Sequence, residues 1–108
     1  MADKRDLDAA YFTLLRARGD LAELQRHADW LGEEQRRIRR FLAESGAAGD
    51  EIPARLRRPL AAVDGDMARA LQARLDVLAD ELAKSPERLA AAEAFVEECE
   101  RELAALRS

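Results

Sequence analysis

The sequence predicts an all-α protein: a long antiparallel helical hairpin with a third helix, forming either a three-helix bundle or a dimeric helical bundle. Of the 108 residues 48% are apolar, and most of these are Ala and Leu. A β-sheet needs β-branched and aromatic side chains, which are scarce here. The apolar residues also recur three and four positions apart, which is typical of helices that pack against other helices. The β-branched aliphatic residues are Ile38, Ile52, Val63, Val77 and Val96.

The first predicted helix covers residues 6–44. Its apolar residues follow a heptad pattern that continues through Gly19, so we expect one helix and not two. At about 1.5 Å per residue the helix would be nearly 60 Å long. The seam consists of Leu7, Ala10, Leu14, Ala17, Leu21, Leu24, Ala28, Leu31, Ile38 and Leu42, with Gln35 as its single polar member.

Two further helices are predicted after a loop at residues 45–52, where two glycines fall among small residues. The second covers residues 59–84, because Pro59 suits a first helical turn. Its apolar stripe repeats nearly every eleven residues, and Gly65 is a point where it could kink. The third covers residues 86–107, because Ser85 and Pro86 form a favourable helix start. The whole chain is then one helical domain.

Composition excludes several classes of function. The chain carries 18 basic and 22 acidic residues, for a net charge of −4, with one Cys and one His. Neither a disulfide framework nor a zinc site can be built from Cys99 and His27, and no motif of an enzyme active site is found. We expect Cys99 to be a buried hydrophobe, and we expect no enzyme activity and no metal. The acidic balance and the lack of a groove-reading motif argue against direct nucleic-acid binding. Without an apolar leader or span, we expect a cytoplasmic protein that does not enter membranes.

The unequal helix lengths predict a partner-binding face. A first helix longer than the second and third leaves part of its stripe uncovered, unless the third helix folds back along it. We expect either a second copy of the chain, giving a homo-oligomer, or a helix from another protein to cover it. The predicted partner-binding residues are Leu14, Leu21, Leu24, Trp30, Leu31 and Phe41, with Trp30 as the main anchor.

Arginines flank the loop on both sides and form a basic tip. Guanidinium groups bind phosphates and carboxylates in pairs, so an anionic nucleotide is one candidate ligand of this tip. The alternative is that these arginines simply stabilise the helix terminus and solvate the surface. The residues singled out are Arg36, Arg37, Arg40, Arg55 and Arg58.

The segment from Ala68 to Leu82, ARALQARLDVLADEL, resembles the first coiled-coil helix of the RsiG-type anti-sigma factors of actinobacteria. Members of that family are helical hairpins that hold a sporulation sigma factor in a manner that depends on bound cyclic di-GMP. Gln72 and Asp76 match the last two places of the family's ligand motif, and Arg69 lies one position from its arginine. The motif's Glu, Ser and Arg places fall on Ala61, Gly65 and Ala68.

The resemblance therefore implies a transcription regulator of anti-sigma type. It implies a sigma factor or another transcription component as the partner. It also implies cyclic di-GMP as a ligand at Arg69, Gln72 and Asp76.

Overall fold

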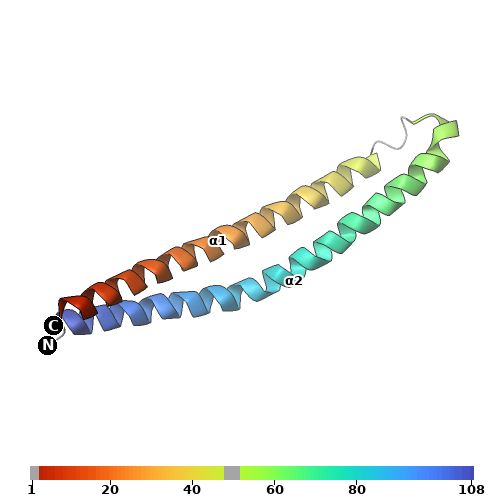
Figure 1. The fold of residues 1–108 in the computed structure, drawn as a ribbon. Coiled ribbons are helices and arrows are strands. Elements are labelled where there is room, and N and C mark those ends of the chain that lie inside the picture. The colour runs from red at the N-terminus through yellow and green to blue at the C-terminus, as the bar shows by residue number, and fades with distance from the viewer. Residues whose placement is uncertain (1–2, 48–51) are drawn as a thin grey trace. The chain divides into compact units, whose positions relative to one another are not determined.

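The computed structural model describes residues 3–47 and 52–108, and within these ranges the chain consists of two α-helices and no strand. Helix α1 covers Lys4–Ala47 and helix α2 covers Ala54–Arg107. Figure 1 shows α1 and α2 as the two long helices of the chain. The all-α class is thereby confirmed, and so is the helical hairpin.

Helix α1 is uninterrupted through Gly19, as the heptad phase predicted. Its start is fixed by Asp3, whose side-chain Oδ1 accepts a hydrogen bond from the backbone N–H of Asp6 at 2.9 Å. Such a cap satisfies one of the N–H groups that lack a helical partner in the first turn. The helix ends three residues later than predicted, and of the predicted 45–52 loop, residues 48–51 lie outside the described residues.

Helix α2 corrects the prediction of separate second and third helices. It begins at Ala54, five residues before the predicted start at Pro59, and continues through Ser85 and Pro86 without a break. Gly65 lies within the same helix and has no positive φ.

The physical reason is the phase of the apolar seam. From Leu71 to Leu106 every seam position of α2 is buried or half-buried, and Ser85 occupies one of them. A proline inside a helix costs about 3 kcal/mol, because it lacks the N–H and its ring crowds the preceding turn. Burial of one continuous seam on both sides of Pro86 offsets that cost. The seam positions are Leu71, Leu75, Leu78, Leu82, Ser85, Leu89, Ala92, Val96, Cys99, Leu103 and Leu106.

The chain divides into two compact units, and each contains one segment of each helix. Unit 1 combines the residues up to Asp29 with those from Lys84 onward, and unit 2 covers Trp30–Ala83. In unit 1 the segments are antiparallel. Asp6 and Leu106 line the same hollow, and Arg18 pairs with Glu100 at 3.5 Å.

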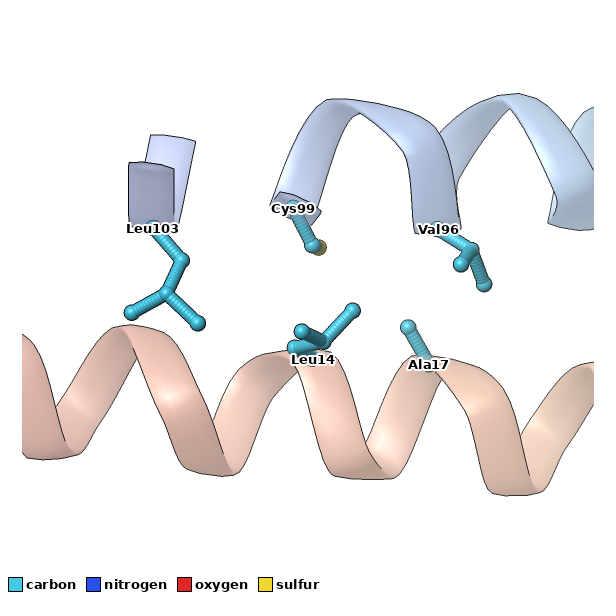
Figure 2. Close-up of a cluster of buried hydrophobic side chains, with 5 residues drawn as sticks. All are labelled: Leu14, Ala17, Val96, Cys99 and Leu103. Carbon is cyan, nitrogen blue, oxygen red and sulfur yellow. The ribbon is translucent and has the colours of Figure 1, made fainter. Parts of the chain in front are cut away.

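Each unit has its own apolar core. In unit 1, Leu14 and Ala17 of α1 face Val96, Cys99 and Leu103 of α2, as Figure 2 shows. Cys99 is buried there as a free thiol, which confirms its prediction as a buried hydrophobe. In unit 2 the core consists of Leu31, Ile38, Leu75 and Leu78, and the side chain of Leu78 is 0% exposed.

The predicted seam of α1 is confirmed at every position. All its members, Gln35 included, are buried or half-buried. Because the side chains opposite belong to α2 of the same chain, this seam contributes to the core of each unit.

Candidate partner-binding face

The structure corrects four of the six predicted partner-binding residues. Leu14 and Leu31 are each 3% exposed, and Leu21 packs against the unit 1 core. Leu24 is half-buried in the same seam. Helix α2 therefore covers the seam that the sequence analysis assigned to a partner. Trp30 and Phe41, in contrast, are 43% and 45% exposed.

The uncovered stripe lies on α2 and not on α1. Helix α2 has 54 residues against 44 in α1, and every residue from Pro53 to Asp64 is exposed. A helical segment of only about three turns gains little stability in water from propensity alone. These first turns of α2 are exposed and lack the packing that usually stabilises a helix. The length mismatch predicted from the sequence exists, but in the opposite helix.

Apolar residues nevertheless continue along these exposed turns, on a line beside the core seam. They recur four and three positions apart, so they lie on one side of α2. We call this line the outer stripe, and Arg74 fills the position between its last two members. The outer stripe consists of Leu56, Leu60, Val63, Met67, Ala70 and Val77.

The outer stripe is well exposed: Val63 is 60% exposed, Val77 50% and Met67 40%. Isolated apolar side chains on a surface are common, but a contiguous row of them marks a site of interaction. The row therefore requires a functional explanation.

Two aromatic residues of α1 extend the outer stripe into a face. Phe41 and Met67 line one open groove of about 390 Å³, together with Leu42 and Leu71 from the edge of the core. Trp30 lies eleven residues before Phe41, which is about three helical turns, so both rings project from the same side of α1. We call the outer stripe together with Trp30 and Phe41 the apolar face of unit 2.

Unit 1 shows no such alignment among its described residues. Its large exposed apolar side chains are Tyr11, Phe12, Leu15 and Phe95. Three of these lie within five residues of α1, where the rings of Tyr11 and Phe12 meet edge to face with their centroids 6.0 Å apart. Phe95 is the sole contribution from α2.

The predicted basic tip is divided between the end of α1 and the start of α2. Arg36, Arg37, Arg40, Arg55 and Arg58 are all exposed. The guanidinium of Arg37 lies 3.6 Å from Glu33 and 3.7 Å from Glu34. The two neighbouring arginines, Arg39 and Arg57, are exposed as well, and Arg57 Nε donates to the carbonyl of Ile52 at 3.1 Å.

The residues matched to the nucleotide motif are exposed on successive turns of α2. Gln72 Nε2 donates to Asp76 Oδ1 at 3.1 Å, and Arg69 forms an ion pair with Asp66. The one cation of this group is thus already paired with a carboxylate. The surrounding carboxylates oppose an anionic ligand.

Within residues 3–47 and 52–108, no three His, Cys, Asp or Glu side chains lie close enough together to hold a metal ion. In the same ranges no helix is both long and apolar enough to cross a membrane.

A second helix that begins at Pro59 does not separate the outer stripe from the core seam. Its apolar residues then form one stripe from Leu60 to Leu82. The signal that separates the two is the spacing of Leu56, Leu60, Val63 and Met67, which stays out of phase with the seam.

Comparison with known proteins does not extend this description. The sequence matches no protein-family model, and neither a curated protein nor a solved structure is significantly similar to it.

Proposed function

We propose that the chain is a non-enzymatic protein–protein interaction module, and that it binds a partner helix on the apolar face of unit 2. The supporting observation is the outer stripe, which has the spacing of a coiled-coil seam while the seam beside it is already filled. A helix laid along the outer stripe would bury it in the way that an amphipathic helix fills an apolar groove.

The shape of the face fits this role. The groove lined by Phe41 and Met67 offers a recess for one large side chain of the partner. Phe41 lines the groove and Trp30 projects from the same side of α1 about three turns away. Aromatic residues are common anchors of protein interfaces. The exposed turns from Ala54 to Asp64 would gain the packing that they lack.

A photocrosslinker placed on the face tests the proposal. Val63 is replaced by p-benzoyl-phenylalanine in cells of the organism that encodes the chain, and adducts are identified by mass spectrometry. The matched control places the same residue at Ala79, which is exposed and projects from the opposite side of α2. We expect a defined adduct from position 63 and none from position 79. Equal adducts at both positions, or none at either, would contradict the proposal.

The resemblance of residues 68–82 to anti-sigma factors supports a finer version, in which the module regulates transcription and the partner is a sigma factor. A sigma-factor peptide in the position 63 adduct is the expected result of that version. An adduct that contains no transcription component would exclude it while leaving the docking face in place.

A ligand-responsive regulator is the second candidate function. The hydrogen bond between Gln72 and Asp76 holds two motif residues in a fixed relation. Calorimetric titration with cyclic di-GMP at two temperatures tests it, since a zero enthalpy at one temperature would not recur at the other. We favour docking, because Arg69 is already paired with Asp66.

A further inference from the structure

One charged residue interrupts the outer stripe. Arg74 lies four residues after Ala70 and three before Val77, on the same side of α2 as both. A helix that covers the stripe from Leu56 to Val77 would be about 32 Å long, or about six turns. Arg74 therefore lies within the surface that such a helix would cover.

Arg74 has no acidic partner of its own among the residues that the structure describes. Its side chain is exposed and forms no ion pair with them. Its neighbours three and four residues away on α2 are all uncharged, so no pair of the kind that helices form along one face is available. These neighbours are Ala70, Leu71, Val77 and Leu78.

A docked helix would change the surroundings of the Arg74 guanidinium. Apolar side chains of the partner would displace water from it, and a charge that loses water without gaining a carboxylate opposes binding. A guanidinium binds a carboxylate through two parallel hydrogen bonds, which replace those to water. A single polar residue in an otherwise apolar seam also fixes the register and the choice of partner.

We propose that the occupant of the apolar face is an amphipathic helix of a different protein, and that its apolar stripe carries one Asp or Glu opposite Arg74. This inference rests on the proposed function, because it names the chemistry of the partner for the same face. The outer stripe contains no acid, so a second copy of the chain, paired stripe to stripe, would not supply this carboxylate.

The groove of unit 2 adds a second feature to the partner helix. Met67, one of the residues that line it, precedes Arg74 by seven residues, which is about 10 Å along α2. The partner's acid should therefore lie about two turns from the large apolar side chain that enters the groove. An acid and a large apolar residue one heptad apart are the recognition pattern that we expect.

Selection from a displayed peptide library tests this pattern. The library consists of amphipathic helices of about 22 residues, long enough to span the outer stripe, with every stripe position randomised. The baits are the full chain and two variants with the same change in charge, Arg74→Glu and Arg58→Glu. Arg58 is exposed on the side of α2 away from the outer stripe, so Arg58→Glu is the matched control.

The expected result is a reversal of the selected charge at Arg74→Glu alone. The wild-type chain and Arg58→Glu should both select an acid at one stripe position, with a large apolar residue seven positions away. Arg74→Glu should select Lys or Arg there instead. A selected acidic peptide should bind Arg74→Glu at least about a hundredfold more weakly than the wild type, because two carboxylates then face each other.

Circular dichroism separates a lost contact from a lost fold. Because Arg74 is exposed, Arg74→Glu should keep the helical signal of the wild type. If Arg74→Glu and the wild type select the same helices, the guanidinium reaches past the partner into water and the inference is overturned.

A variant of the stripe itself separates this inference from the proposed function. Val63→Glu should abolish binding of every selected helix. Helices that lack an acid but lose binding to Val63→Glu would leave the docking function in place and overturn only the pairing with Arg74. Helices that bind Val63→Glu unchanged, or a selection that recovers none, overturn both.

Two measurements on the chain alone address the other occupants. Self-association in sedimentation that Val63→Glu abolishes would identify a second copy on the face. Binding to phosphatidylglycerol vesicles that Val63→Glu abolishes would identify a lipid surface. Either result overturns the partner helix, and we expect neither.

Discussion

Replacing Pro86 by Ala tests whether α2 is one helix. Pro86 lies far from both ends of Ala54–Arg107 and is exposed, so the substitution removes no core contact. Alanine restores an N–H that can donate to the carbonyl of Leu82, four residues earlier. Pro costs about 3 kcal/mol relative to Ala in a helix interior. Against this, losing a proline frees the unfolded chain, which costs about 0.4–1 kcal/mol. The net expectation is a gain of about 2 kcal/mol in the free energy of unfolding.

The assay is unfolding by urea, followed by circular dichroism at one fixed protein concentration, so that any association contributes equally. Pro53→Ala is the matched control, because Pro53 precedes α2 and the bond to it from Leu56 N–H, at 2.9 Å, uses only the backbone carbonyl. We expect the control to show only the unfolded-state effect, a loss of about 0.4–1 kcal/mol, and no gain in stability.

The opposite result would refute the reasoning. If a separate helix began at Ser85, Pro86 would occupy its first position, where the missing N–H has no helical partner and the fixed φ is favourable. Pro86→Ala would then leave stability unchanged or lower it. An unchanged urea midpoint for Pro86→Ala therefore argues for two separate helices, and a raised urea midpoint argues for one continuous α2.

Three further predictions concern packing and propensity. Leu78→Ala should cost about 3 kcal/mol, because Leu78 is 0% exposed, whereas Leu15→Ala at a 43% exposed position should cost less than about 1 kcal/mol; equal urea midpoints would contradict this. Gly19→Ala should raise the free energy of unfolding by up to about 1 kcal/mol, and with it the thermal midpoint, because outside the local helix backbone and the adjacent residues no atom lies within 4 Å of the added Cβ. A double-mutant cycle on Arg18 and Glu100 should give about 0.2–1 kcal/mol, since both side chains are about half exposed, and a larger value would mean that the pair is shielded from water.

The core could be predicted from the sequence because heptad phase is a property of many residues at once. On α1 that phase outweighed one glycine, and Gly19 lies in a continuous helix as expected. On α2 the same phase continues through Ser85, but the local start signal of Ser85 and Pro86 was given more weight. A local sequence signal indicates the backbone conformation that a residue prefers. Burial of an apolar seam on both sides of that residue can outweigh this preference.

The candidate face was harder to predict, because it depends on which seam is covered by the other helix of the same chain. Trp30 and Phe41 were identified because they lie outside the strict heptad. Leu14, Leu21, Leu24 and Leu31 have the residue types of an interface, and the structure uses them inside the chain. Sequence periodicity indicates that a stripe packs against another helix. Which helix packs there depends on the length and path of the opposite helix.

A hairpin of two helices also explains why an exposed stripe and a small core occur together. Each helix has one neighbour, so each unit buries only a single seam, and its described core contains four or five buried side chains. Cores of this size leave little free energy of unfolding. On the proposed function, a partner helix on the outer stripe would give α2 a second neighbour where its first turns have none. Because binding stabilises the bound state by mass action, folding of residues 54–64 and occupation of the apolar face would then be a single linked equilibrium.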